Sequence, residues 1–320
     1  MNLHLLLCAA AVLPLTMCQQ YNNGLLPAGS LQAADPQADA LLSEAKAFVA
    51  AGELSKAKSK LKDIALNHAY APCAPEARLL LGDVYEKQGL PRDAFSEYEK
   101  VVTRYQNSPL YTKALDRQLA MAMAAAEGKL QVSVLGLWKA ELESSAVEQW
   151  LASVITNAPY NDMAATATSI LARYRLRKER YEEAALTFAE LVEKYPDSRY
   201  APEAQLMVAQ IWAASRTRGD QNMANLARAQ EAYEEFSLRF PGHADAGKAL
   251  AEASNVRRLL IQQELETGRY YLERAREYDS AIFCLENVIR QKSINPEAAR
   301  EAETLLQKAR THKANANQKS

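Results

Sequence analysis

The stretch from Tyr181 to Ala204 reads YEEAALTFAELVEKYPDSRYAPEA, and it constrains the fold of this chain more than any other. Small and apolar residues recur on one helical face of its first part, which predicts an amphipathic helix. The turn Tyr195–Ser198 ends that helix, because a proline disfavours helical geometry in the residue before it. Asp197 and Ser198 are predicted to cap the helix that follows.

The same arrangement recurs along the chain, each time with a small or apolar residue early in the second helix. These second helices are predicted at residues 54–68, 91–105, 142–157, 181–195, 224–239 and 278–291. Their anchor residues are Ala57, Ala94, Val147, Ala184, Ala229 and Ala281. Spacing and residue sizes resemble the tetratricopeptide repeat, a pair of antiparallel helices of about 34 residues. In the clearest copy, Gly82 and Ala94 are expected to be small because the two helices approach there, while Tyr85 and Tyr98 fill the space beside them.

Helix-forming residues dominate from Ala34 onward, and runs of alternating β-branched residues are missing. The sequence therefore predicts an all-α fold, an α-solenoid of five to six tetratricopeptide-like helix pairs over residues 36–313. Insertions are expected at Gly128–Leu137 and at Arg216–Met223, and a long helix at Ala244–Arg274. A last helix from Pro296 is predicted to cap the solenoid, followed by a disordered tail at 314–320.

Residues 1–17 resemble a lipoprotein signal peptide. The apolar run from Leu5 to Met17 is about 13 residues long, which is short for a membrane span and typical of a secretory signal. It ends at Leu15-Thr16-Met17-Cys18, a pattern similar to the bacterial lipobox, so Cys18 is the predicted lipid anchor. An ordinary cleaved signal and a buried apolar start remain open, because Met17 is bulky and no Lys or Arg precedes the run. Residues 18–35 are predicted to form a flexible tether.

Motifs for chemistry are missing from the sequence. Neither a glycine-rich phosphate loop nor an HExxH or GxSxG pattern is found, so we expect no catalytic residue, cofactor or metal. A net charge of -1 gives no reason to expect a nucleic-acid partner. His68 and His243 are interpreted as surface residues of turns, and Cys73 and Cys284 as small packing residues.

Two groups of residues are candidates for protein binding. In this repeat class, certain positions of each first helix line the concave surface, and in the fourth copy they are Thr166, Ser169, Arg173, Leu176 and Arg177. Arg173 and Arg177 are one helical turn apart, so together they are predicted to bind a carboxylate of an extended peptide. An exposed edge at Tyr270 and Tyr271 is a candidate partner contact. The alternative interpretation is that the arginines are ordinary solvated charges and that the tyrosines fill space between helices.

The chain as a whole resembles the BamD family of outer-membrane β-barrel assembly lipoproteins. The resemblance rests on the lipobox-like Cys18, on the inter-repeat turn Tyr195–Tyr200, and on the segment Arg257–Val288 with Tyr270-Tyr271. It implies a non-enzymatic lipoprotein on the periplasmic face of the bacterial outer membrane. It also implies as partners the β-barrel insertase, other subunits of the assembly complex and unfolded outer-membrane proteins, with the membrane bound through the lipid anchor.

Two other classes of protein stay open. One is another periplasmic tetratricopeptide adaptor, either a TolA-binding cell-division coordinator or a pilus-assembly lipoprotein. The other is an enzyme that uses the solenoid as a scaffold, for instance in peptidoglycan turnover. That class needs a paired carboxylate or a nucleophile, and the sequence offers neither.

Overall fold

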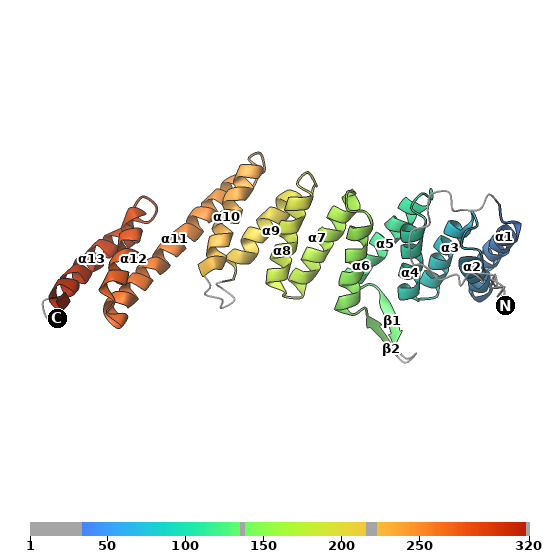
Figure 1. Cartoon of the computed structure of the whole chain (residues 1–320), viewed down its shortest axis with the longest axis horizontal. Helices are drawn as coiled ribbons and strands as arrows, with labels where there is room; N and C mark the ends of the chain where they lie inside the picture. The colour runs from blue at the N-terminus through green and yellow to red at the C-terminus, as the bar shows by residue number, and fades with distance from the viewer. Residues whose placement is uncertain (1–33, 135–137, 216–222, 318–320) are drawn as a thin grey trace, which may run out of the picture. The chain divides into compact units, whose positions relative to one another are not determined.

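A computed structural model describes residues 34–134, 138–215 and 223–317. Over these residues the chain forms thirteen α-helices, one π-helix and one β-hairpin (Figure 1). It divides into two compact units, residues 1–116 and 117–320. The first unit contains α1 Pro36–Ala50, α2 Leu54–Asn67, α3 Ala74–Lys87 and α4 Pro91–Arg104, and α5 Tyr111–Ala126 runs across the boundary. The second unit contains β1 Gln131–Val134, β2 Trp138–Glu141, α6 Ser144–Asn157, α7 Asp162–Arg177, α8 Tyr181–Lys194, α9 Ala201–Ala213, α10 Met223–Arg239, α11 Ala246–Tyr270, η2 Tyr271–Ala275, α12 Tyr278–Arg290 and α13 Pro296–Asn317.

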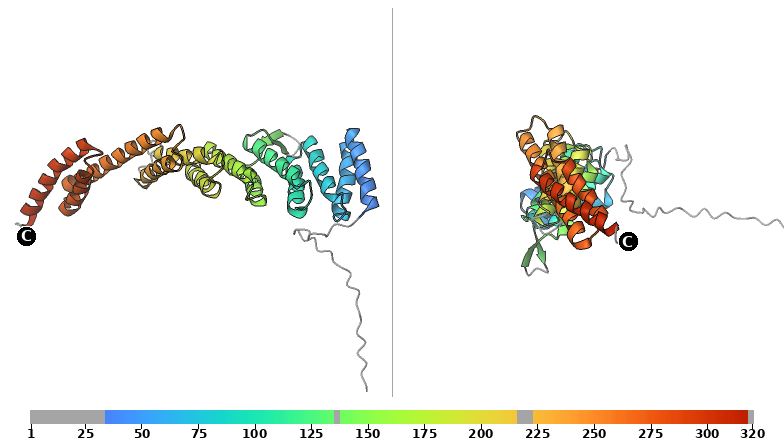
Figure 2. Two further views of the ribbon diagram at one scale, coloured as in Figure 1. Left: turned by 90° about the horizontal axis from the view of Figure 1, so that it is seen from above. Right: turned by 90° about the vertical axis from the view of Figure 1, so that its left-hand side faces the viewer.

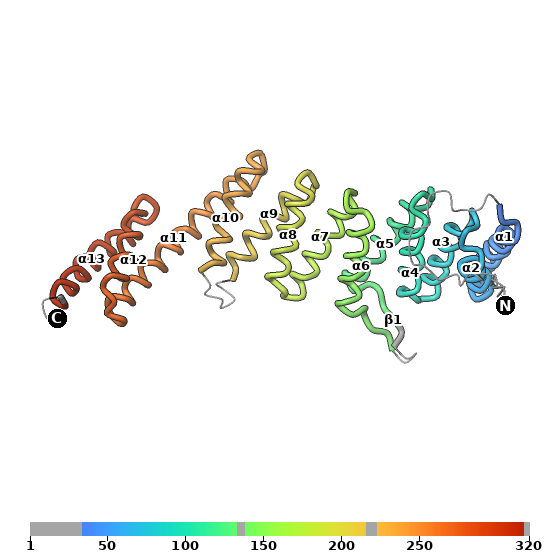
Figure 3. The backbone as a smooth tube through the Cα atoms, in the orientation of Figure 1, coloured from blue at the N-terminus to red at the C-terminus, as the bar shows by residue number. Residues whose placement is uncertain are grey.

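Helices that follow each other in the chain pack side by side within each unit. In the first unit α2 packs between α1 and α3, and α4 packs on α3. In the second, every helix from α6 to α12 packs on the next one, as the two views of Figure 2 and the tube in Figure 3 show. The first unit thus contains the pairs α1/α2 and α3/α4, and the second contains the pairs α7/α8, α9/α10 and α11/α12, with α13 after them. The predicted α-solenoid of helix pairs is confirmed.

The six second helices lie where the sequence predicts them, as α2, α4, α6, α8, α10 and α12. Their six anchor residues are all buried, with exposed fractions of 0% or 1%. A small residue suits this position because the two helices of a pair come close there. The recurring pattern therefore marks the contact between the helices of each pair.

A second small position lies on the first helix of a pair, opposite a large side chain. Gly82 is the clearest case, because a Cβ added there would lie 2.4 Å from the Tyr98 ring. Gly268 faces Leu285 in the same way, at 3.0 Å. Gly82 is thus small to make room for Tyr98, which refines the expectation that two backbones meet there.

The corner between the helices of a pair also repeats. A residue with left-handed backbone lies five positions before the anchor in four pairs: Gly52, Gly89, Glu179 and Arg276, with φ of 76°, 70°, 59° and 58°. Gly89 comes seven positions after the small residue Gly82, whereas Arg276 comes eight positions after the small residue Gly268. The π-helix η2 lies in that longer interval and accommodates the extra residue.

Two details differ from the expectations. The insertion at 128–137 contains part of a β-hairpin, in which Gln131 pairs with Glu141 and Val134 with Trp138. Its strands have four residues each, too few to give a clear alternating pattern. The last helix continues through residues 314–317, which the sequence assigns to a disordered tail, because Ala314 and Ala316 favour helix. The signal segment 1–17, most of the tether and the insertion at 216–222 lie outside the described residues.

The capping role predicted for Asp197 and Ser198 is wrong. The turn uses two successive backbone bonds, from Ser198 N to Tyr195 O and from Ala201 N to Ser198 O, each 3.0 Å. Helix α9 therefore begins only at Ala201, and its N-cap residue Tyr200 makes no capping bond with its side chain. The last helix, in contrast, does have a side-chain cap, since Ala298 N donates to Asn295 Oδ1 at 3.2 Å.

Candidate functional site

Arg173 and Arg177 both lie on the exposed side of α7, as predicted, but their guanidinium groups have separate partners. Arg173 Nη2 lies 2.6 Å from Glu203 Oε2 on α9. Arg177 Nη2 donates to the carbonyl of Ala126 at the end of α5, at 2.5 Å, and its guanidinium lies 5.7 Å from the centre of the Tyr174 ring. The structure thus places the two arginines on one face of α7 but gives each guanidinium a different partner. Their joint binding of a carboxylate stays a prediction.

The other predicted positions on α7 differ in exposure. Thr166 is half-buried and its Oγ1 lies 3.4 Å from the hydroxyl of Tyr200. Ser169 is buried and Leu176 packs against the apolar core, so neither belongs to a binding face. The prediction of a surface position is wrong for Ser169, which is only 4% exposed.

Tyr200 and Arg199, which the sequence did not single out, extend the face of α7. The Arg199 guanidinium lies 4.8 Å from the centre of the Tyr200 ring, and its Nη2 donates to the Tyr200 hydroxyl at 2.6 Å. Burial raises the pKa of this hydroxyl, but bonds with Thr166 and Arg199 and the charges of Arg199 and Arg173 outweigh burial and hold the pKa below its usual value. We call Thr166, Arg173, Arg177, Arg199 and Tyr200 the Arg173 surface. Three arginines make it cationic, and a surface of this kind suits an anionic group.

The Arg173–Glu203 pair has counterparts elsewhere in the chain. Lys46 Nζ on α1 lies 2.6 Å from Glu76 Oε1 on α3. Arg269 on α11 pairs with Glu301 on α13. In each case the cation directly follows the small residue of its helix, which is the first helix of a pair. It forms an ion pair with a carboxylate on the helix two further along the chain.

A signal for this pattern is present in the sequence. Pro-Glu-Ala opens α3 at Pro75–Ala77 and α9 at Pro202–Ala204. The glutamate of each tripeptide is the carboxylate of one ion pair, and the cation of that pair lies thirty residues earlier in the chain. The repeated tripeptide together with this spacing therefore predicts both ion pairs. The side chains of both pairs are about half-exposed. Each pair is therefore worth at most about 1 kcal/mol.

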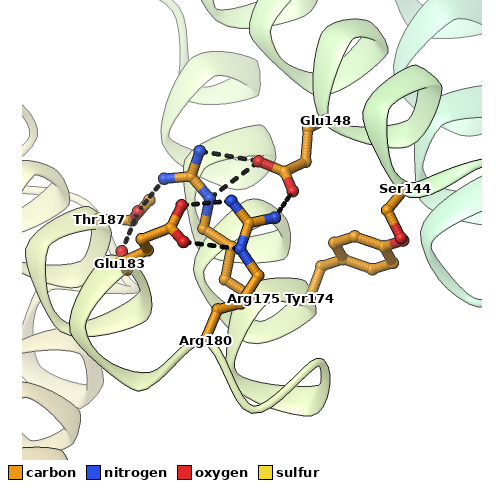
Figure 4. Close-up of polar contacts among 7 residues, drawn as sticks. All are labelled: Ser144, Glu148, Tyr174, Arg175, Arg180, Glu183 and Thr187. Atoms are coloured by element: carbon orange, nitrogen blue, oxygen red, sulfur yellow. Dashed lines mark hydrogen bonds and ion pairs between the residues drawn. The ribbon is translucent and has the colours of Figure 1, made fainter.

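A more enclosed network joins α6, α7 and α8 (Figure 4). Glu148 of α6 accepts from Nε and Nη2 of Arg175, at 3.1 and 2.9 Å, and also pairs with Arg180. Arg175 Nη1 donates to Thr187 Oγ1 at 2.7 Å, and Arg180 Nε donates to Glu183 Oε1 at 2.7 Å. The bond from Arg180 lowers the pKa of Glu183 and, in return, the pKa of Arg180 is raised. All of its charges are matched inside the protein, so this network holds helices together and is no binding site.

The two candidate tyrosines differ in exposure. Tyr270 ends α11 and is 59% exposed, whereas Tyr271 begins η2 and packs partly against the core formed by α11, α12 and α13. Their ring centres are 6.0 Å apart in an edge-to-face arrangement. Tyr270 is thus exposed and Tyr271 half-buried, and a partner contact at these two tyrosines stays a prediction.

The remaining candidate residues are settled only in part. Cys18 lies outside the described residues, so lipidation stays a prediction. Cys73 and Cys284 are free thiols and half-buried, and burial, with a bond to Asp39, raises the pKa of Cys73 to about 11. His68 is less exposed than expected, because its Nδ1 lies 2.8 Å from Oδ2 of Asp35 and its side chain is only 15% exposed.

In residues 34–134, 138–215 and 223–317, no three histidine, cysteine, aspartate or glutamate side chains are grouped so that they would hold a metal ion. In the same part of the chain, no helix combines the length and the apolar character needed to cross a membrane.

Comparison with solved structures finds other repeat proteins. A tetratricopeptide repeat protein of Parabacteroides merdae shares 13% identity with a TM-score of 0.32, over 86% of this chain and 99% of that one. The C-terminal part of a repeat-containing protein of Cytophaga hutchinsonii shares 15%, with a TM-score of 0.35, over 83% and 86%. PilF of Pseudomonas aeruginosa shares 14%, with a TM-score of 0.30, over 85% and 99%. TM-scores this low carry no functional argument.

Comparison with family models gives a match in sequence. No curated protein matches the chain. The tetratricopeptide repeat model matches residues 42–109 and 137–199, which contain most of α1 to α4 and all of α6 to α8. These two stretches of the chain match tetratricopeptide repeats, a class of repeat that forms a protein–protein interaction scaffold.

Proposed function

We propose that this protein is a non-enzymatic scaffold lipoprotein of the machinery that assembles outer-membrane β-barrel proteins. Anchored through Cys18 to the periplasmic face of the outer membrane, it binds the barrel insertase, other subunits of that machinery, or unfolded outer-membrane proteins. The repeats support the general role, and the resemblance of Tyr195–Tyr200 and Arg257–Val288 to the BamD family supports the specific one.

The observation that carries the proposal is the Arg173 surface. Arg173 pairs with Glu203 where both side chains are about half-exposed, so exchanging this carboxylate for another costs little. The carboxylate of an extended peptide takes the place of Glu203, and Arg199 and Arg177 add positive charge beside it. Charge-assisted bonds from a guanidinium to a carboxylate are among the stronger ones available at a protein surface.

A peptide-binding measurement tests this role. The ligand is a labelled peptide with the C-terminal sequence of an outer-membrane β-barrel protein and a free carboxylate. Replacing Arg173 and Arg177 by Glu is expected to weaken its binding at least about tenfold in fluorescence anisotropy, because two attractive charges become repulsive. The matched control is Lys46→Glu, which reverses the equivalent cation in the other unit and should leave the affinity within about twofold of wild type. Equal affinity of the double variant and wild type would refute the role of this surface.

Affinity isolation tests the choice of partner. The tagged full chain is recovered from detergent-solubilised bacterial envelopes, and the proposal expects a large β-barrel protein in stoichiometric amounts. Recovery of pilus components or of TolA without a β-barrel protein would contradict it and favour another periplasmic adaptor. The Arg173 and Arg177 variant serves as the control, since it should recover less of any nascent outer-membrane protein.

A further inference from the structure

The first unit contains a groove on a different set of helix faces from the Arg173 surface. It has a volume of 420 Å³ and lies between α2, α3 and α4. Four cations and two carboxylates line it: Lys62, Arg78, Lys100 and Arg104, and Asp93 and Glu97. The groove therefore carries an excess of two positive charges. We call it the Arg78 groove.

Arg78 is the most deeply buried cation of this groove, at 3% exposed. Its Nη1 donates to Glu97 Oε2 at 2.8 Å and its Nη2 donates to the carbonyl of Ala65 at 2.7 Å. Its Nε is buried without a hydrogen-bond partner among the described residues. Glu97 is already shared, since its other oxygen lies 2.7 Å from Lys100 Nζ. One carboxylate thus serves two cations, and the positive charge of the groove is only partly balanced.

The rim of the groove combines a cation with an apolar side chain. Lys62 Nζ lies 5.9 Å from the centre of the Tyr85 ring and forms no ion pair with any residue that the structure describes. Leu66, one helical turn further along α2, is 57% exposed. A ligand here meets a positive charge and an apolar contact within one turn of helix.

The second unit contains a groove at the same place relative to its helix pairs, with different chemistry. This groove, of 350 Å³ between α8, α9 and α10, we call the Arg228 groove. At the positions of Arg78, Lys100 and Leu66 it has Gln205, Glu235 and Glu193. Its charged residues are Arg228 and Arg239 against Glu193, Glu231 and Glu235, which leaves one excess negative charge. The fold thus supplies a groove in each unit, and of these two grooves the Arg78 groove is the basic one.

We propose that the Arg78 groove binds an acidic segment of a partner protein. Carboxylates of the segment lie against Lys62, Lys100 and Arg104, and an apolar side chain of the segment packs on Leu66 and beside Tyr85. Charge complementarity selects an acidic occupant, and the exposed leucine distinguishes a peptide from a simple anion. This is a second protein-binding site, in the other unit from the Arg173 surface.

The test uses the full chain and a labelled twelve-residue peptide of alternating Glu and Asp with one central Leu, followed by anisotropy at low salt. Replacing Lys62 and Lys100 by Gln is expected to weaken binding about tenfold, because each exposed ion pair contributes up to about a fivefold effect. The matched control is Arg228→Gln with Arg239→Gln, which removes two cations from the Arg228 groove and should not weaken binding. Raising the salt to about 1 M, where the screening length is about 3 Å, should also weaken the wild-type interaction.

Several outcomes would overturn the proposal. They are unchanged affinity in the Lys62 and Lys100 variant, equal affinity for a peptide with Gln and Asn in place of Glu and Asp, and tighter binding of a single-stranded oligonucleotide than of the peptide. Lys62→Gln alone keeps the test decisive if the double variant folds poorly, because Lys62 is exposed and pairs with no carboxylate in the described part of the chain. The Arg173 and Arg177 variant should bind the acidic peptide as wild type does, so that failure of one site is distinguished from failure of the other.

Discussion

Glu179 occupies a backbone conformation that disfavours its side chain. It has φ of 59° at the corner between α7 and α8, where two other pairs use Gly52 and Gly89. A residue with a Cβ costs about 1–2 kcal/mol in left-handed geometry, and the entropy lost by a glycine offsets part of this. We therefore expect Glu179→Gly to raise the free energy of unfolding of the second unit by about 0.5–1 kcal/mol.

The measurement is denaturation followed by tryptophan fluorescence, because all three tryptophans, Trp138, Trp150 and Trp212, lie in the second unit. Glu182→Gly is the control, since Glu182 is exposed in the first turn of α8, where glycine should instead lower the stability by up to about 1 kcal/mol. A lower stability of Glu179→Gly than of wild type would contradict the prediction.

At the scale of residues, the sequence predicts sizes better than partners. The buried anchor residues and Gly82 follow from the sequence, because a close contact between two helices requires a small side chain. This requirement recurs at a regular spacing along the chain. The partner of Arg173 does not follow so directly, because an ion pair joins residues far apart and many carboxylates are available. Ser198 was assigned wrongly because a turn closed by its own backbone bonds resembles a capping sequence.

Within the stack of helices, Glu148 is the residue that links three elements. Glu148→Gln keeps the shape of the side chain but leaves Arg175 and Arg180 without the carboxylate they share. The Glu148 side chain is only 17% exposed, so we expect the second unit to lose about 1–3 kcal/mol of stability, the range for removing one partner of an enclosed polar contact. Glu190→Gln is the control, because that carboxylate is 51% exposed and pairs with Lys194 on the same helix. Equal effects of the two substitutions would show that the network adds nothing.

The same network predicts a dependence of stability on pH. The bond from Arg180 holds the pKa of Glu183 below its usual value in the folded protein. Its contribution to stability is therefore complete above the unfolded-state pKa of about 4.3 and is lost as the pH falls through the lower folded-state pKa. Tryptophan-monitored unfolding between neutral and acidic pH should show a smaller loss of stability on acidification for Glu183→Gln than for wild type. An identical pH profile would contradict this.

Helices are predicted well from this sequence, and the hairpin and π-helix are not. The second helices carry a strong periodic pattern over fourteen or so residues, whereas β1 and β2 have four residues each. The π-helix adds one residue to an α-helix. That residue is detected only by counting from the small residue to the corner, which takes seven positions from Gly82 to Gly89 but eight from Gly268 to Arg276.

For the whole molecule, the proposed location makes one prediction. If Cys18 carries a lipid, Cys18→Ala should move the protein from the membrane fraction of a bacterial envelope to the soluble fraction, because lipid chains supply the membrane affinity. Immunoblotting of the two fractions is the measurement, with Cys73→Ala as a control that should stay with the membrane. Unchanged fractionation of Cys18→Ala would refute lipid anchoring.

The π-helix at Tyr271–Ala275 has a consequence for how this chain tolerates change over evolutionary time. Removing one residue from most of α11 would rotate everything beyond it by about 100° and carry one face of the helix out of contact with its neighbours. Removing one residue from the π-helix would instead leave an ordinary helical turn. The interval between the small residue and the corner would then equal the one from Gly82 to Gly89. Gly268 and Leu285 would keep their contact on either side. Single-residue insertions and deletions among descendants of this sequence should therefore accumulate at Tyr271–Ala275.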